Sequence, residues 1–513
     1  STSAPQSLAQ RGDNRSHRPT NQAFRDFIGS GWGPRPDQLP DRSDAAPWAA
    51  ARREQLGAHF PGERLVIPAG PLVTRNNDCD YRFRPHSAFA HLAGTGTDFE
   101  PDAVLVLEPL TAPGQDAGDT PTHEAVLYFR PRASRTSEEF YADTRYGELW
   151  VGQRPSIDEV EAATGIRCAH IDSLPDALAK DAGPDAVQLR VVAAADAAVT
   201  ALVDRVRTAA GLAAGEDAAQ ADDALAEATS ELRLTKDPWE VEQLQEAVDA
   251  TKAGFEDLIR SLPRATGHRR GERVLEGAFG AKAREEGNGL GYETIAAAGN
   301  HANTLHWINN DGAVHPGELV LVDAGVEVDS LYTADVTRTI PVDGRFTAPQ
   351  RRVYQAVLDA ADAAFARANE SGCRFRDVHA AAMEVIAARL EEWGMLPDGV
   401  SAADSLGPDG QFHRRWMVHG TSHHLGLDVH DCAQARREMS MEAVLQPGMV
   451  FTIEPGLYFR ADDLLVPEEL RGIGVRIEDD VVVREDGSVE RLTRDIPRTV
   501  EEVESWVTGL LQD

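Results

Sequence analysis

Five residues in the last third of this chain have the types and the surroundings of a metal site. Four are carboxylic acids and one is a histidine: Asp323, Asp335, His423, Glu454 and Glu478. Oxygen-rich ligands with a single imidazole suit hard or borderline divalent ions such as Mn²⁺, whereas a structural zinc site normally uses cysteine thiolates. The ligand types therefore favour a catalytic site for divalent metal ions.

Four carboxylates and one imidazole are also a suitable ligand set for a pair of divalent ions. Two dications held roughly 3.5 to 4 Å apart need carboxylates that bridge them, and four carboxylates offset most of the combined charge. A water molecule bound between such ions loses a proton easily, and the resulting hydroxide is a nucleophile near neutral pH. The expected chemistry is metal-assisted hydrolysis, with Mn²⁺ as the expected ion and Co²⁺ or Zn²⁺ as the alternatives.

Each of the five residues lies in a distinctive local string. The strings are VLVDAG (320–325), ADVTRT (334–339), HGTSHHLGLDVH (419–430), TIEPGLY (452–458) and VRIEDD (475–480). In this order they resemble the dinuclear metallopeptidases of the pita-bread fold, the group that contains methionine aminopeptidase, prolidase and aminopeptidase P. The resemblance implies an α/β (α+β) chain, in which an N-terminal mixed-sheet α/β domain precedes a pita-bread (creatinase/aminopeptidase-like) catalytic domain. It also implies that Glu454 binds one metal ion and accepts the proton of the attacking water, and that Glu478 bridges both ions.

Four further residues are candidates for the substrate cleft, and their roles are implied by the same resemblance. His306 contacts substrate or shuttles a proton, and His419 and His430 line the cleft. His430 or His306 then stabilises the oxyanion and helps to protonate the leaving proline nitrogen. Arg476 supports the carboxylates or the substrate pocket, with an ordinary salt bridge on an edge strand as the alternative. Taken alone, a histidine beside Trp307 is more often a packed or surface residue, but the string around His306 favours the site.

A β-hairpin is predicted over residues 318–342, because apolar residues alternate on both arms. Asp323 and Asp335 lie one on each arm, and antiparallel arms bring two such side chains to one place. Their spacing is one residue longer than the usual aminopeptidase P spacing. We therefore expect an extra residue or a bulge in the turn at 329–332.

Other strands are expected to present the remaining groups. Residues 289–312 predict a strand, a loop and a second strand, with His306 near the end of the second. An apolar run ends at Glu454, where the following Pro-Gly turn exposes the carboxylate. Arg476 and Glu478 alternate along one strand, so we expect them to share a face of it.

The chain is too long for a single core, so two domains are expected. A helix start at Asp237, with Pro238 at the first helical position and Glu240 three residues on, places the boundary near residue 231. Short β-rich runs bounded by Gly, Pro and Asp predict the N-terminal mixed sheet: 63–70, 102–109 and 124–131. The expected divisions are a disordered leader (1–20), an N-terminal aminopeptidase P-type domain (21–230) and a pita-bread metallopeptidase catalytic domain (231–513).

The N-terminal part of the chain helps to distinguish aminopeptidase P from prolidase. TRNNDCDYRFRPHSAFAHLAG (74–94) resembles the N-terminal signature of aminopeptidase P, with a loop that packs Tyr81 and Phe83 into a local core as the alternative. Aminopeptidase P releases the N-terminal residue from peptides with proline in the second position. Prolidase, which cuts only Xaa-Pro dipeptides, is the alternative; a non-catalytic peptide-binding module is a remote one, since such modules typically lose the metal ligands. The family often has an aromatic residue a few positions after His430, where this chain has Ala435. We therefore expect a proline pocket that is built differently.

Composition limits the partners and the compartment. The net charge is -33, which argues against nucleic acid or an anionic membrane as a partner. No apolar run approaches the roughly 18 to 20 residues of a membrane span. The four cysteines show no CxxC spacing and the first twenty residues lack an apolar signal segment, so reduced cysteines and a cytoplasmic location are expected. The resemblance further implies a homo-oligomer, a dimer or tetramer, in which a neighbouring N-terminal domain closes the cleft.

Overall fold

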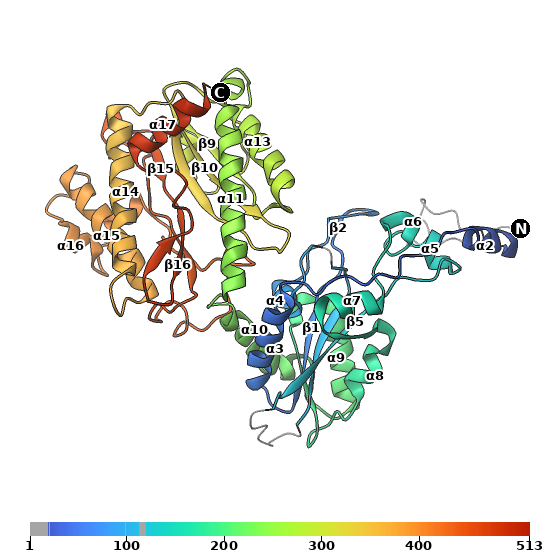
Figure 1. Ribbon diagram of the computed structural model, residues 1–513. Coiled ribbons are helices and arrows are strands. Elements are labelled where there is room, and N and C mark those ends of the chain that lie inside the picture. Colours follow the sequence, from blue (N-terminus) through green and yellow to red (C-terminus); the bar gives the residue numbers. More distant parts are fainter. Residues whose placement is uncertain (1–18, 20, 98, 112–119, 513) are drawn as a thin grey trace, which may run out of the picture. The chain divides into compact units, whose positions relative to one another are not determined.

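The computed structural model describes residues 19, 21–97, 99–111 and 120–512. The chain divides into two compact units that meet between Thr229 and Ser230 (Figure 1). The leader predicted over 1–20 lies outside the described residues, apart from Pro19. All four cysteines are free. Within the described ranges, every helix is too short or too polar to span a bilayer.

A five-stranded mixed sheet forms the middle of the first unit and confirms the predicted α/β class. In sheet order its strands are β6 (Arg167–His170), β5 (His123–Phe129), β4 (Val104–Pro109), β1 (Glu63–Pro68) and β7 (Gln188–Val191). The pairs β1–β4 and β4–β5 are antiparallel, whereas β1–β7 and β5–β6 are parallel. The helices are α2 (Gln22–Gly29), α3 (Ala46–Ala58), α4 (Ser87–Ala93), α5 (Glu138–Ala142), α6 (Glu148–Val151), α7 (Ile157–Thr164), α8 (Leu174–Ala179) and α9 (Ala197–Ala209), followed by α10 (Ala219–Leu232) at the boundary.

The core of this unit follows from the alternation of side chains along the strands. Val66, Val104 and Val126 share one face of the sheet, and they pack with Leu174 of α8 and Val203 of α9. A short hairpin, β2 (Thr74–Asn76) with β3 (Cys79–Asp80), lies in the segment with the aminopeptidase P signature. Tyr81 follows it with 54% of its surface exposed, so packing of this residue into a local core is wrong.

The second unit holds its strands between two helix layers. Figure 1 shows α11 with α13 on one side and α14 with α15 on the other. The longer helices are α11 (Pro238–Arg260), α13 (Gly271–Glu286), α14 (Ala348–Ala368), α15 (Phe375–Glu392) and α17 (Val500–Leu510), with shorter α12 (Leu262–Thr266) and α16 (Ala402–Leu406). α11 begins as predicted, with a capping box between Asp237 and Glu240 and Pro238 in the first turn.

The strands of this unit are short and pair mostly as hairpins. They are β8 (Gly289–Leu290), β9 (Ile295–Ala298), β10 (Leu319–Ala324), β11 (Val326–Glu327), β12 (Val336–Pro341), β13 (Val450–Ile453), β14 (Gly456–Tyr458), β15 (Gly474–Arg476), β16 (Asp479–Val483) and β17 (Val489–Arg491). The sheets run β12-β10-β9, β13-β16-β17, β14-β15 and β11-β8, and every pair in them is antiparallel.

The predicted hairpin is present, and its two arms keep one register down to the bridge between Glu327 and Thr333, so the bulge that the spacing predicts does not occur in the paired arms. β10 pairs with β12 so that Asp323 lies opposite Thr337. The chain turns after Val328, and Leu331 there has a φ of 74°, a left-handed conformation that is uncommon for a residue other than glycine. A Cβ at Gly325 would lie 1.8 Å from the carbonyl oxygen of Ala334, so only glycine fits where the two arms approach.

Two strand predictions need correction. Residues 289–312 do form two strands, β8 and β9, but the second ends at Ala298, and His306 lies in the loop that follows it. Arg476 ends β15 and Asp479 begins β16, so Glu478 lies between two strands rather than on a continuous one. An isolated bridge from Thr337 to Glu478 connects this break to β12.

Arg338 of β12 connects this strand to the break between β15 and β16 in the interior of the protein. Its side chain is fully buried and donates to the carboxylate of Asp479 at 2.7 Å. It also donates to the backbone carbonyls of Glu478, at 2.7 Å, and Pro497, at 2.7 Å. The guanidinium therefore fixes the strand that carries Asp335 against the break that carries Glu478.

This buried pair gives a prediction about stability. Asp479→Ala leaves the Arg338 cation buried without its partner, and we expect a loss of about 3–5 kcal/mol in the free energy of unfolding. Glu490→Ala is the control, because it removes an exposed ion pair with Arg484 and is expected to cost about 1 kcal/mol or less. Urea denaturation of both variants measures the difference, and equal losses would contradict the role given to Arg338.

Candidate metal centre and substrate cleft

One cavity of about 740 Å³ in the second unit contains the candidate site. All nine residues singled out from the sequence line it: His306, Asp323, Asp335, His419, His423, His430, Glu454, Arg476 and Glu478. Its apolar wall comes from Ile295, Leu305, Ile308 and Val429. Ala435 is not among the lining residues, so the substitution noted there lies away from this cavity.

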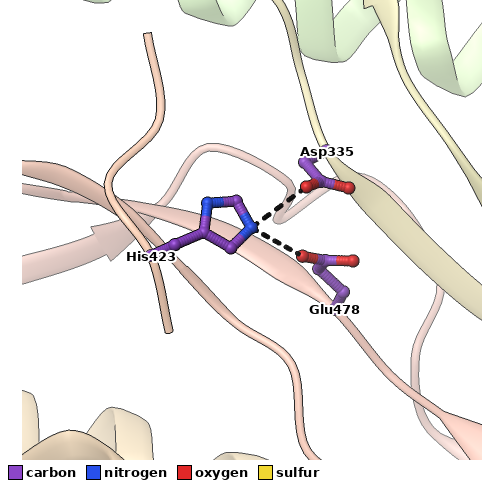
Figure 2. Close-up of side chains that lie close together, drawn as sticks. All are labelled: Asp335, His423 and Glu478. Atoms are coloured by element: carbon purple, nitrogen blue, oxygen red, sulfur yellow. Dashed lines mark ion pairs between the residues drawn. The ribbon is translucent and has the colours of Figure 1, made fainter. Parts of the chain in front are cut away.

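His423 lies among three of the candidate ligands. Its Nε2 atom is 3.2 Å from Oδ2 of Asp335, 3.4 Å from Oε1 of Glu454 and 3.8 Å from Oε1 of Glu478. Figure 2 shows the imidazole turned toward Asp335 and Glu478, which come from different segments. Ligand atoms of Asp335, His423 and Glu478 lie within 4.8 Å of one another, a separation that one metal ion can span.

The backbone sets which nitrogen of His423 faces this cluster. Nδ1 lies 3.0 Å from the carbonyl oxygen of His424, and because a carbonyl only accepts, Nδ1 carries the proton. Nε2 is therefore the atom available as a metal ligand. Burial lowers the pKa of His423, but the hydrogen bond and charge of Asp335 outweigh burial and raise it to about 9. Without a cation, a proton on Nε2 takes the place of the metal.

Asp323 is held by two polar groups. Arg476 donates to its Oδ2 at 2.8 Å. The hydroxyl of Tyr292 lies 2.7 Å from Oδ1 of Asp323 and 2.5 Å from Oδ1 of Asp335, so it links the two aspartates of the hairpin. Burial and the neighbouring charge of Asp335 raise the pKa of Asp323. The ion pair between Arg476 and Asp323 is largely buried, and both residues line the cavity.

Glu454 and Glu478 complete a set of carboxylates that fits divalent cations. Burial raises the pKa of Glu454 to about 8, with opposing effects from the charges around it. Burial and the charges of Asp335 and Glu454 raise the pKa of Glu478 well above its usual range. One oxygen of Glu478 accepts from Thr337 at 2.8 Å, but the other is buried and has no hydrogen-bond partner among the described residues. Such an orphaned carboxylate oxygen is costly unless a cation binds it.

His419 belongs to a chain of hydrogen bonds beside the metal centre. Its Nδ1 donates to the carbonyl oxygen of Gly420 at 2.6 Å, so Nε2 accepts from the Tyr458 hydroxyl at 2.6 Å. Arg476 in turn donates to the Tyr458 oxygen at 3.1 Å. Burial and the charge of Arg476 lower the pKa of His419 to about 4, which keeps this imidazole neutral.

His306 and His430 face the cavity in a different way. The ring of His430 packs edge-on against His423 with centroids 4.4 Å apart, and burial lowers its pKa. His306 lies in an exposed stretch of the loop after β9. Both histidines line the cavity, and among the described residues their ring nitrogens make no hydrogen bond. His424, the residue after His423, points away from the cluster and stacks on Phe375 with centroids 4.5 Å apart.

Two site residues were missed in the sequence. Tyr292 precedes β9 in a string that also contains Glu293, and no feature of that string marks its hydroxyl as the link between the aspartates. Tyr458 is different, because it closes the string TIEPGLY that was already assigned to the site. Its position four residues after Glu454 was the one available signal.

Comparisons with known proteins identify the relatives of this chain. The model of metallopeptidase family M24 matches residues 242–485, and that of the aminopeptidase P N-terminal domain matches residues 49–188. Xaa-Pro aminopeptidase 1 of Streptomyces coelicolor is 47% identical over 484 residues, which cover 94% of this chain and 91% of the relative. Xaa-Pro aminopeptidase 2 of the same organism is 48% identical over 480 residues, covering 93% and 94%.

A solved structure extends the likeness to the fold. The Pseudomonas aeruginosa aminopeptidase PepP has a TM-score of 0.75 and 29% identity, with 92% of this chain and all of that one covered. The two family models fall on different units, and the whole-length relatives contain both. The chain therefore belongs to metallopeptidase family M24, among the Xaa-Pro aminopeptidases of the aminopeptidase P type.

Proposed function

We propose that this chain is a metal-dependent aminopeptidase that releases the N-terminal residue from peptides with proline in the second position. The observation that carries the proposal is the single cavity that contains five candidate metal ligands beside three histidines and an arginine. The match to an aminopeptidase P N-terminal domain favours this activity over that of prolidase. Full-length relatives named Xaa-Pro aminopeptidases support the same substrate class.

The cofactor that we propose is a pair of divalent ions held by Asp323, Asp335, His423, Glu454 and Glu478. Four carboxylates with one imidazole favour Mn²⁺, with Co²⁺ and Zn²⁺ as alternatives. When bound, such ions polarise a carbonyl group and lower the pKa of water. The unpartnered oxygen of Glu478 and the raised pKa values of the buried carboxylates support a cationic occupant.

The remaining residues have roles that follow from their contacts. Glu454 accepts the proton of the attacking water, since its carboxylate lies at the cavity wall beside His423. Arg476 orients Asp323 through their 2.8 Å ion pair, and its charge opposes the rise in the pKa of Asp323 that burial and Asp335 cause. His419 stays neutral and holds the Tyr458 hydroxyl in place at the cleft.

Cleavage before proline also needs an acid for the leaving nitrogen, because the departing imino group is basic. His430 and His306 line the cavity, and their ring nitrogens make no hydrogen bond among the described residues, so we assign the stabilisation of the oxyanion and the protonation step to one of them. The apolar side chains of Leu305, Ile308 and Val429 provide a surface for the proline ring.

We further propose the organisation that the sequence predicts, with an N-terminal domain over 21–230 and a catalytic domain over 231–513. The two family models, at 49–188 and 242–485, support these limits. A homo-oligomer, either a dimer or a tetramer, and a cytoplasmic location stay predictions.

The substrate proposal is tested by hydrolysis of matched peptides. We expect metal-stripped protein to be inactive, and protein with Mn²⁺ restored to release the first residue from Xaa-Pro-Yaa tripeptides and longer peptides. Matched peptides with alanine in place of proline are the control and should be cut much more slowly. Cleavage confined to Xaa-Pro dipeptides would indicate a prolidase, and the absence of any metal-dependent cleavage would contradict a catalytic role.

The raised pKa of Glu454 predicts how pH affects the metal-free protein. The folded state holds this proton up to about pH 8, whereas the ordinary pKa of a glutamate is 4.5. A raised pKa stabilises the folded state below the unfolded pKa, and this stabilisation is lost as pH rises through the folded pKa. We therefore expect the Tm of metal-free protein to fall between pH 5 and 8.

Thermal denaturation with and without Mn²⁺ measures this effect. Because metal ions compete with protons for the same ligands, the gain in Tm from Mn²⁺ should increase as pH rises. Glu454→Gln should flatten the pH dependence of the metal-free protein. A Tm of metal-free protein that is constant or rising over this range would show that the carboxylates are not crowded without metal.

A further inference from the structure

Glu272 is a buried carboxylate with a full set of hydrogen-bond donors, and it lies outside the metal centre. It stands in the first turn of α13 and is completely buried. One oxygen accepts from the backbone N–H of Ala298 at 2.8 Å and lies 2.7 Å from Nδ1 of His301. The other accepts from the indole N–H of Trp307 at 3.0 Å and the backbone N–H of Gly312 at 2.6 Å.

These four donors belong to a single loop, residues 298–312, which we call the 298–312 loop. Ala298 and Gly312 are its two ends, so one carboxylate closes the loop at its base. His301 and Trp307 are inside it, and their rings stack with centroids 3.9 Å apart. A Cβ on Gly312 would lie 2.7 Å from the Glu272 carboxylate, which shows how closely the loop end approaches it.

The 298–312 loop brings His306 to the cavity, together with Leu305 and Ile308. The backbone carbonyl of His306 accepts from Ile308 at 3.0 Å, and other side-chain hydrogen bonds of the loop are made at Asn303 and Asn310. Asn303 donates to the carbonyl of Phe459 at 3.1 Å. Near the C-terminal end of the loop, the side chain of Asn310 accepts from the backbone N–H of Ala296 in β9. Among the described residues, the imidazole of His306 makes no hydrogen bond, so its position depends on the backbone around it.

The side-chain hydrogen bond closest to His306 in the sequence is the one that its neighbour Trp307 donates to Glu272. A Gln at position 272 would keep the shape of the side chain, but its NH₂ group would face N–H donors instead of accepting from them. At least one of the four bonds would then be lost, and both bonds to Trp307 and Gly312 would be lost if the NH₂ group faces them. The loop would remain attached at Asn303 and Asn310, but its attachment to α13 would be weakened.

We propose that Glu272 is a positioning residue for the proposed aminopeptidase reaction: it holds the 298–312 loop so that His306 points into the substrate cleft. The proposal rests on the role assigned above to His306. Glu272 touches neither the cavity nor the candidate metal ligands, so its effect on turnover passes through the loop.

A double-mutant cycle on the Mn²⁺-loaded protein tests this inference. The variants are Glu272→Gln, His306→Ala and the double variant, assayed for kcat and KM on an Xaa-Pro-Yaa tripeptide. Glu285→Gln is the matched control, since it makes the same substitution on α13 at an exposed side chain. A displacement of the order of an ångström at a catalytic group can cost about 100-fold, so we expect Glu272→Gln to lower kcat about 10- to 100-fold.

The coupling between the two sites separates positioning from a general structural effect. In the His306→Ala background, Glu272→Gln should lower kcat by about twofold or less, because the group that it positions is gone. Bound Mn²⁺ and Tm are measured for each variant, so that losses from unfolding or metal release are recognised. If Glu272→Gln does not fold, Trp307→Phe replaces it, since this change keeps the ring stack but removes one donor.

Each outcome bears on a different claim. Equal losses from Glu272→Gln in both backgrounds, or full activity of a folded Glu272→Gln or Trp307→Phe variant, would overturn the positioning role of Glu272 alone. Full activity of His306→Ala would overturn the role of His306 and the inference that depends on it. Either result leaves the metal-dependent peptidase activity of the wild-type protein intact, and loss of that activity would contradict the proposed function itself.

Discussion

The crowding of four carboxylates in a buried space is the constraint on which the rest of the catalytic unit depends. Asp323, Asp335 and Glu478 are buried and Glu454 is partly buried around a single imidazole, and Arg476 forms an ion pair with Asp323. Such a set of like charges is strongly unfavourable without further positive charge. Protons on the carboxyl groups or bound divalent cations can offset this repulsion. Only the cations leave the carboxylates ionised, as hydrolysis requires. The same interaction therefore determines both the stability of the unit and its chemistry.

The fold opposes this repulsion by fixing each ligand on a separate, well-supported segment. The two aspartates belong to one hairpin, where Gly325 permits the close approach of the arms and Tyr292 links the carboxylates. Arg338 joins that hairpin to the break between β15 and β16, next to Glu478. The histidine is oriented by a backbone carbonyl, which leaves Nε2 facing the carboxylates. Short strands between helix layers thus hold in place a group of side chains that would otherwise move apart.

Much of this arrangement was predictable from the sequence because the ligands lie in strings whose local geometry is regular. The hairpin, the helix start at Asp237 and the end of β13 just before Glu454 all follow from alternation, capping and turn residues. Long-range contacts were less accessible. The hydroxyl of Tyr292 and the carboxylate of Glu272 have no distinctive local pattern, since their partners are defined only when distant segments meet. The loop after β9 was assigned in part to a strand, because its anchors are side chains rather than ladder hydrogen bonds.

We propose that this cluster holds two divalent cations, and the metal content of the protein is the measurement that decides it. Purified protein equilibrated with Mn²⁺ and then freed of unbound ion is analysed for manganese by mass spectrometry, alongside its peptidase activity. The account predicts about two manganese ions per chain, in keeping with the four carboxylates of the site, and an activity that rises with occupancy. Full activity in protein with less than about one metal ion per chain would contradict it, because a dinuclear site cannot then be the origin of the hydrolysis.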